Sequence, residues 1–170
     1  MNKNIRPIRI EGNLAYVPLT RGYEAVIDAD DAHLVAGVNW TAYVAPHGVY
    51  AYRQPTINGK KTYLPMHRLI NKTPKGFETD HIDGNGLNNR KTNLRSASRS
   101  QNEVNKAPKK NNTSGYKGVY WCKERKKWAA EIMMDGKRVH LGRHETIEAA
   151  YSAYCDASKK MHGEFARLGK

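Results

Sequence analysis

Two adjacent residues, Asp80 and His81, are followed by Asn93 and Asn102 inside a strongly basic chain. Hydrolysis of a phosphodiester needs a base that deprotonates water and a cation that neutralises charge on the phosphate. A histidine suits the base because its unperturbed pKa lies near neutrality. Carboxylate and amide oxygens are hard ligands, which favour Mg²⁺ or Mn²⁺. The four residues therefore predict a single divalent-metal centre that can cut a phosphodiester.

The charge of the chain indicates a polyanionic partner. Its 170 residues contain 29 Lys and Arg against 16 Asp and Glu, a formal net charge of +13. A surplus of this size is typical of proteins that bind nucleic acid, although a basic protein without such a partner is the simpler alternative. Residues 106–170 carry 15 basic and 7 acidic residues, so we expect the main DNA-docking surface there.

Several classes of protein are disfavoured. The two cysteines, Cys122 and Cys155, form no Cys-x-x-Cys pair, which excludes a four-cysteine zinc site and disfavours a disulfide framework. No apolar run approaches the roughly 20 residues of a membrane helix, and no secretory signal is present. We therefore expect no membrane partner and a location inside the cell, in the host cytoplasm or nucleoid.

The segment before the motif is predicted to form β-structure. Residues 1–62 predict a β-rich region of short strands, broken at Gly12-Asn13 and Arg21-Gly22. Asn58-Gly59 predicts a hairpin turn, and Asp28 is a candidate N-cap for a short helix. Residues 61–66 are expected to form one further strand.

The motif region, residues 63–105, predicts two strands over 77–82 and 94–97, then a helix capped by Ser98. On a strand, Asp80 and His81 would point to opposite faces, so a bulge or twist is needed to bring both to one centre. Residues 106–115 are rich in polar residues and contain Pro and Gly, and they are expected to be a linker.

Residues 116–170 predict a compact module. Strands are expected over 116–122, 128–134 and 137–141, with Asp135-Gly136 as the second turn. A helix should begin after Thr146 and end at Gly163. Because an isolated three-stranded sheet must bury one face, the helix is expected to pack on it. The complete chain is therefore expected to be an α+β protein.

The motif region resembles the HNH endonucleases of phage and intron-homing type. The resemblance covers about residues 63–105 and rests on the runs at 66–69, 74–76, 80–89, 93–95 and 101–102. It implies a ββα-metal unit in which Asp80 and Asn102 bind one metal ion and His81 is the general base. Asn93 would orient the His81 segment. Asparagine at 102, where many relatives have histidine, makes zinc a poorer fit than magnesium.

His67 falls within the same resemblance. It could contact phosphate or frame the site, while a structural histidine on a strand is an equal alternative. Asp83, Gly84, Asn85, Asn88 and Asn89 are expected to shape the loop, since Gly and Asn tolerate left-handed backbone conformations.

Residues 113–168 resemble an AP2 domain, through the runs at 114–121, 127–132, 136–142 and 148–154. The resemblance implies a three-stranded sheet that enters the major groove of double-stranded DNA. The side chains expected to contact DNA are Lys117, Tyr120, Arg125, Lys127, Arg138, His140 and Arg143. Plant AP2 domains carry arginine where Tyr120 and Met133 stand and tryptophan where His140 stands. Their target sequence therefore cannot be transferred.

These observations predict a metal-dependent HNH endonuclease of homing type, with one Mg²⁺ or Mn²⁺ per active site and no organic cofactor. The alternative is a non-catalytic, sequence-specific DNA-binding or transcription regulatory protein. The complete set of Asp80, His81, Asn93 and Asn102 argues against that alternative, because a scaffold does not need all four. A single centre cuts one strand, so monomer and homodimer stay open.

Overall fold

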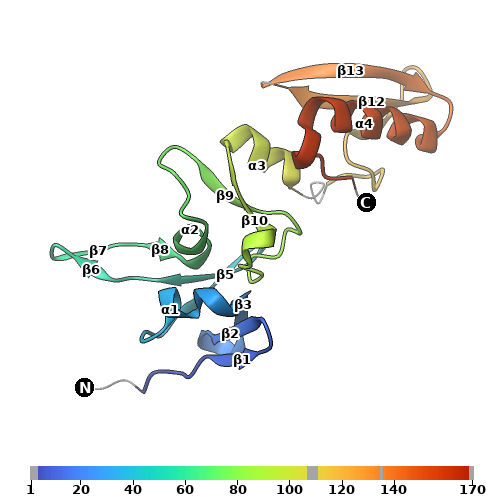
Figure 1. The fold of residues 1–170 in the computed structure, drawn as a ribbon. Coiled ribbons are helices and arrows are strands. Elements are labelled where there is room, and N and C mark those ends of the chain that lie inside the picture. The colour runs from blue at the N-terminus through green and yellow to red at the C-terminus, as the bar shows by residue number, and fades with distance from the viewer. Residues whose placement is uncertain (1–3, 107–110, 135, 169–170) are drawn as a thin grey trace. The chain divides into compact units, whose positions relative to one another are not determined.

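The computed structural model describes residues 4–106, 111–134 and 136–168. The chain forms two compact units, Met1–Ser98 and Arg99–Lys170. Both combine helices with small antiparallel sheets, so the fold class is α+β as predicted (Figure 1).

The first unit begins with a three-stranded antiparallel sheet in the order β1-β2-β3. The expected break between the first two strands is present, because Gly12 has a φ of 58°, which a glycine adopts without strain. The elements of this part are β1 (Arg9–Glu11), β2 (Leu14–Pro18), a 3-10 turn (Thr20–Gly22), β3 (Glu24–Asp28), a second 3-10 turn (Ala29–Asp31) and α1 (Ala32–Val35).

The prediction that Asp28 caps a helix is wrong. No cap hydrogen bond forms from its side chain. The Asp28 carboxylate instead accepts from Arg90 Nε at 2.9 Å and from the Lys91 backbone N–H at 2.8 Å. It therefore anchors the segment that follows the motif loop.

A second sheet in the order β4-β5-β8 and a short hairpin follow. The predicted Asn58-Gly59 turn joins the hairpin strands, with positive φ at both residues. The elements are β4 (Thr41–Ala45), β5 (Gly48–Arg53), β6 (Thr56–Ile57), β7 (Lys60–Lys61), β8 (Leu64–Pro65) and α2 (Met66–Asn71). The single strand expected over 61–66 is wrong, since the segment is divided between β7 and β8 and α2 begins at Met66.

The remaining elements of the first unit carry the motif. They are β9 (Glu78–His81), a 3-10 turn (Lys91–Asn93) and β10 (Leu94–Ala97), and the two strands pair in antiparallel register. The core of this unit joins the first sheet to the second sheet and to α2. Trp40 is completely buried in it and donates from its ring nitrogen to the carbonyl of Val35 at 2.9 Å.

The second unit contains the three predicted strands and the predicted long helix. Its elements are α3 (Arg99–Asn105), β11 (Val119–Cys122), β12 (Lys127–Met134), β13 (Lys137–His144), α4 (Ile147–His162) and a 3-10 turn (Gly163–Phe165). Thr146 caps α4 by accepting from the Ala149 N–H at 3.2 Å, and Gly163 ends it, as predicted. Asp135 of the expected turn lies outside the described residues.

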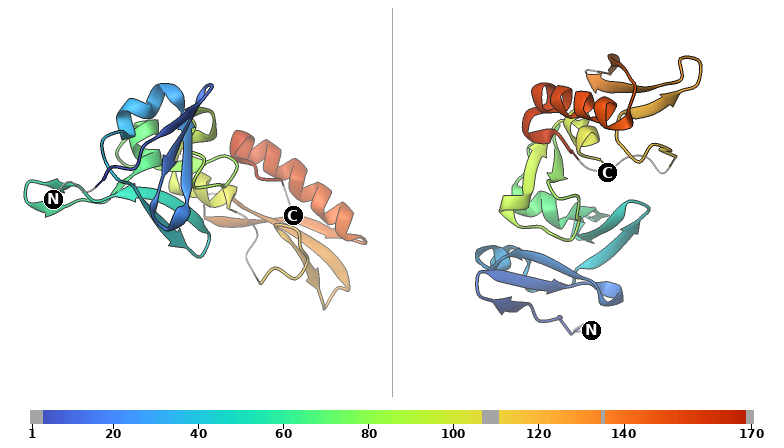
Figure 2. Two further views of the ribbon diagram at one scale, coloured as in Figure 1. Left: turned by 90° about the horizontal axis from the view of Figure 1, so that it is seen from below. Right: turned by 90° about the vertical axis from the view of Figure 1, so that its right-hand side faces the viewer.

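Helix α4 covers one face of the β11-β12-β13 sheet, as the two views of Figure 2 show. Val119, Ala130, Ile132, Ala150 and Tyr154 form the buried core between them. Gly118 precedes this core with a φ of 71°, and a Cβ there would lie 2.3 Å from the Tyr154 ring. Glycine is therefore required where the chain enters β11.

Candidate active site

His81 is buried at the end of β9 and bonded to the amide of Asn89. The two residues are 6% and 0% exposed, and His81 Nε2 lies 3.2 Å from Asn89 Oδ1. The amide nitrogen of Asn89 donates to the Leu87 carbonyl at 3.2 Å, so its oxygen faces the imidazole. An amide oxygen only accepts, hence Nε2 carries the proton and Nδ1 is the basic nitrogen of neutral His81.

Burial keeps this histidine uncharged. Desolvation lowers the pKa of His81, partly offset by the hydrogen bond from its ring to Asn89 and by the charges of Asp83 and Asp80. Desolvation lowers the pKa of His67 to about 3, with smaller contributions from His81 and Arg68. Both imidazoles are therefore neutral at neutral pH, and His81 can accept a proton.

Two further rings surround His81. The His67 ring lies edge-on to it, with 5.1 Å between ring centroids. The Tyr50 ring of β5 lies 6.0 Å from His81 and 6.2 Å from His67. His67 therefore lies beside His81, on α2 and not on a strand.

The side chain of Asp80 lies in a different environment from that of the adjacent His81. Asp80 and Arg95 are directly opposite in the β9–β10 register, and both guanidinium nitrogens Nε and Nη2 lie 2.8 Å from Asp80 Oδ2. The carboxylate is only 4% exposed, and a buried carboxylate requires a cation or hydrogen-bond donors beside it. Arg95 therefore supplies the positive charge that the buried Asp80 carboxylate requires.

The loop after His81 is organised by Asp83 and Asn93. Asn93 Oδ1 accepts from the Asp83 N–H at 3.0 Å, and Asn93 Nδ2 donates to Asp83 Oδ1 at 2.9 Å and to the Asn88 carbonyl at 2.8 Å. Burial alone would raise the pKa of Asp83, but hydrogen bonds from Asn85, Asn88 and Asn93 lower it overall. The Asn93 carbonyl also accepts from the Ile82 N–H at 2.9 Å. Asn93 thus fastens the segment directly after His81.

The N-terminal sheet holds the other side of this loop. The Asn89 N–H donates to the Val26 carbonyl at 2.7 Å, and the Val26 N–H donates to the Leu87 carbonyl at 2.8 Å. Gly86 lies so close to β5 that a Cβ would be 2.4 Å from the Tyr50 ring. The β-rich region therefore positions Asn89, and through it the ring of His81.

The metal ligands predicted from the sequence are Asp80 and Asn102. Asp80 provides a buried carboxylate oxygen, and the described residues contain no group of three or more His, Cys, Asp or Glu side chains that could hold a metal. A site with few protein oxygens suits Mg²⁺ or Mn²⁺, which retain several waters. Asn102 lies on α3 in the second unit, and its role as a ligand stays a prediction.

The predicted DNA-contacting residues fall mainly on the face of the AP2-like sheet that α4 does not cover. Tyr120, Arg138, His140 and Arg143 are exposed there, around Glu131. The Tyr120 hydroxyl donates to Glu131 Oε1 at 2.7 Å, while Arg138 and His140 approach the carboxylate to 3.9 and 3.8 Å. Arg138 and Arg143 make this face cationic, and the acidic Glu131 lies beside Tyr120, Arg138 and His140.

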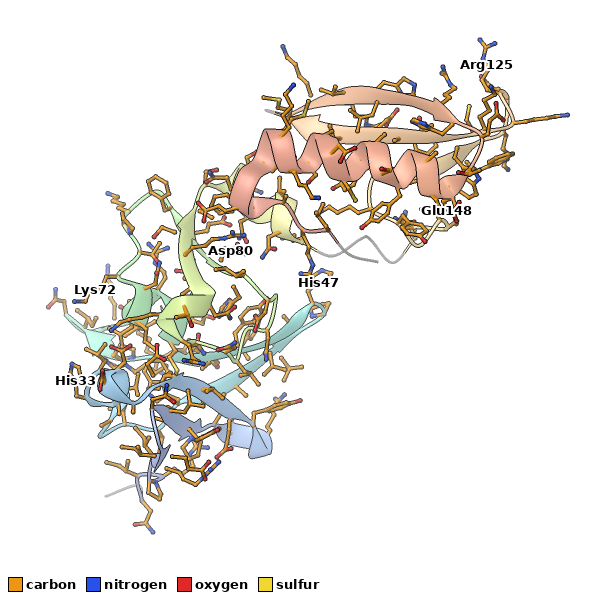
Figure 3. All side chains as sticks on the ribbon, turned by 45° about the vertical axis from the view of Figure 1, so that its right-hand side comes forward. His33, His47, Lys72, Asp80, Arg125 and Glu148 are labelled. Atoms are coloured by element: carbon orange, nitrogen blue, oxygen red, sulfur yellow. The ribbon has the colours of Figure 1, made fainter. Side chains whose placement is uncertain are left out.

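Three other predicted residues lie elsewhere in the second unit. Arg125 is in the turn between β11 and β12 and points outward (Figure 3), and Lys127 pairs with Glu145 at 2.7 Å. The Lys117 ammonium instead donates to the carbonyls of Val104 and Lys106, the latter at 2.7 Å. Desolvation lowers the pKa of Lys117 to about 8. Lys117 therefore caps the end of α3 in this structure.

Asn89, Tyr50 and Arg95 are the candidate site residues that sequence reasoning missed. Arg95 stood in the motif without a role, and Asn89 was assigned only to loop shape. The run Asn88-Asn89 was the available signal, since an asparagine beside a base can fix its tautomer. No spacing in the sequence points to Tyr50.

Comparison with known proteins supports the assignment of both the motif region and the C-terminal module. An HNH endonuclease family model matches residues 72–104, and an AP2 domain model matches residues 114–164. The chain therefore belongs to the HNH endonuclease family and carries an AP2 domain. These two domains indicate a nuclease or a DNA-binding protein.

Two relatives extend the comparison. Protein 3.8 of Escherichia phage T7 is 40% identical over 95 residues, which span 56% of this chain and 78% of that protein. The uncharacterized HNH endonuclease L560 of Acanthamoeba polyphaga mimivirus is 33% identical over 113 residues, 63% of this chain and 58% of its own length. No solved structure matches the chain. Among the described residues, no helix is long and apolar enough to cross a membrane.

Proposed function

We propose that the chain is a metal-dependent DNA endonuclease of homing type that hydrolyses phosphodiester bonds. The observation that carries the proposal is the buried, neutral His81, whose Nε2 is held by Asn89 beside the buried carboxylate of Asp80. A base, a place for a cation and a fixed loop are what this hydrolysis requires.

His81 acts as the general base through Nδ1. Its neutral form is favoured by burial, so it can take the proton of the attacking water at neutral pH. Asn89 sets its tautomer, and the rings of His67 and Tyr50 limit its rotation. Asn93 holds the backbone of the two residues after His81 and so keeps the imidazole in a fixed position.

The family resemblance assigns Asp80 and Asn102 as the ligands of one Mg²⁺ or Mn²⁺. When bound, the ion neutralises charge on the phosphate and stabilises the leaving oxygen. Arg95 holds the Asp80 carboxylate in one orientation through two contacts of 2.8 Å. The expected place of action is the interior of a host cell, which fits the phage origin of one relative.

Double-stranded DNA docks on the AP2 sheet. Exposed arginines on a face opposite the supporting helix can reach base edges and phosphates, and the sequence resemblance assigns this face to the major groove. The contact set comprises Tyr120, Arg125, Lys127, Arg138, His140 and Arg143. Lys117 is left out of this set because its ammonium binds backbone carbonyls.

The proposal is tested by incubating supercoiled plasmid and phage DNA with the protein in Mg²⁺, in Mn²⁺ and in EDTA. Wild type should convert supercoiled DNA to nicked or linear forms only with a divalent ion. Asp80→Asn should bind Mn²⁺ more weakly in calorimetry and nick more slowly, while Glu78→Gln, on the same strand, should do neither. Nicking that persists in EDTA would contradict the metal dependence.

A further inference from the structure

A long acid-free segment precedes the motif. Between Asp31 and Glu78, residues 32–77 contain no Asp or Glu, while their basic residues are Arg53, Lys60, Lys61, Arg68, Lys72 and Lys75. The same segment supplies β4, β5, the β6–β7 hairpin, β8 and α2. Its charge fits a polyanion, although it lies outside the AP2 domain.

Four tyrosines of this segment form what we term the tyrosine row: Tyr43, Tyr50, Tyr52 and Tyr63. Tyr43 and Tyr50 are directly paired across β4 and β5, and Tyr52 follows on the same face by strand alternation. Ala42 and Ala51, paired on the opposite face, are buried in the core. The sheet therefore packs through its alanines and presents its tyrosines away from the core.

Three rings of the row contact one another, and the fourth, Tyr50, lies beside the candidate base. Ring centroids lie 5.1 Å apart for Tyr52 and Tyr63 and 6.2 Å apart for Tyr43 and Tyr52. Tyr50, on the same face, lies 6.0 Å from His81. A strand whose phosphate reaches His81 would thus pass its neighbouring nucleotides along these rings.

The outer rings of the row are available to a ligand. Tyr43 and Tyr63 are each 50% exposed, although large aromatic side chains normally bury most of their surface. Lys60 and Lys61 are exposed on β7, and the hairpin they belong to is tied back by the Thr62 N–H, which donates to the Pro55 carbonyl at 2.8 Å. Exposed aromatic faces beside cations are the combination that binds single-stranded nucleic acid.

We propose that the tyrosine row binds the bases of an unpaired DNA segment next to the phosphate that is cut. Base faces are covered by stacking inside a duplex, so rings exposed in a row can stack only on bases that have left it. The absence of carboxylates from residues 32–77 favours a phosphate-bearing strand over a protein partner. The position next to the cut rests on the proposed function, whereas binding of single strands does not.

The test uses the full chain carrying His81→Ala, in EDTA, so that no DNA is cleaved. Fluorescence anisotropy with an oligothymidine strand and with a duplex measures both affinities. Tyr43→Leu and Tyr63→Leu should each weaken single-strand binding on the order of ten-fold and leave duplex binding unchanged. Tyr43→Phe and Tyr63→Phe should retain it, because the ring is kept. Tyr16→Leu, in the same unit but outside the row, is the matched control.

Photo-crosslinking locates the contact. An oligonucleotide with 5-iododeoxyuridine should crosslink to peptides that contain Tyr43 or Tyr63. The proposal is overturned if the two leucine variants bind single strands like the parent, or if they lose single-strand and duplex binding equally. Tighter binding of RNA than of DNA of the same sequence would also overturn it. Failure of wild type to nick DNA would refute the proposed function, yet leave this binding result unaffected.

Discussion

His81 Nε2 and Asn89 Oδ1 lie 3.2 Å apart in a buried hydrogen bond, and the Asn89 backbone is itself bonded to Val26 of the N-terminal sheet. The bond places the proton of the neutral imidazole on Nε2, which makes Nδ1 the basic nitrogen. The N-terminal region thereby acquires a role in the candidate active site, because it holds the asparagine that sets the state of His81.

Asn89→Asp should shift the acid limb of the nicking rate to higher pH. A carboxylate beside His81 stabilises the imidazolium and raises its pKa by about 1 to 3 units, so less neutral base is present at neutral pH. The pH–rate profile on plasmid DNA measures the shift. Asn85→Asp adds the same charge in the same loop and keeps an acceptor for the Leu87 N–H, so its profile should not move. Identical profiles for the two variants would contradict the role of Asn89.

Acid should destabilise the first unit partly through His67. Its pKa is lowered to about 3, whereas the unfolded chain takes up a proton near the ordinary value of 6.5. As pH falls through this window, the unfolded state binds a proton that the folded state does not. Stability should therefore be complete above 6.5 and fall by about 1.4 kcal/mol per pH unit below it for this one group.

Urea unfolding at several pH values between about 6.5 and 4.5 measures this slope. His67→Phe removes the titrating group and should lower the slope of stability against pH by the amount that corresponds to one bound proton. His47→Phe, at the exposed turn between β4 and β5 (Figure 3), should leave it unchanged. A slope unaffected by His67→Phe would mean that His67 is not buried as a neutral ring.

The elements around the site could be predicted better than its contacts. The β9 and β10 strands follow from local patterns, and α4 follows from the cap at Thr146 and the glycine at 163. Helix α2 was missed because a hydrophobic pattern over six residues is too short to distinguish a helix from a strand. The neighbours Tyr50 and Arg95 come from other strands, and strand pairing sets such contacts independently of local sequence spacing.

Glu131→Gln should strengthen binding to duplex DNA. Glu131 is an acid on the cationic face, close to Tyr120, Arg138 and His140, and it opposes the approach of phosphate. Anisotropy at several salt concentrations should show an affinity a few-fold higher and a steeper salt dependence, as about one more phosphate is neutralised. Glu148→Gln removes the same charge from α4 and should have a smaller effect. Weaker binding by Glu131→Gln would contradict this and would mean that the main effect of Glu131 is to hold Tyr120 in position.

Lys117→Gln should lower stability without changing the salt dependence of duplex binding. The Lys117 ammonium bonds to carbonyls at the end of α3, and Arg167 donates to the Asn105 carbonyl at 3.0 Å. Loss of the charged donor should cost about 1 to 3 kcal/mol. Thermal unfolding and the salt slope of anisotropy measure the two effects. A shallower salt slope with unchanged stability would restore Lys117 to the DNA-contacting residues.

The central claim is that His81 is the base of a metal-dependent nuclease, and single-turnover nicking of supercoiled DNA in Mg²⁺ tests it most directly. Wild type should nick, and His81→Ala should be about 100-fold slower or more, while the two bind duplex DNA equally in EDTA. Wild-type protein that cuts no DNA, including DNA from the genome that encodes it, would contradict the account. So would His81→Ala protein that nicks at the wild-type rate.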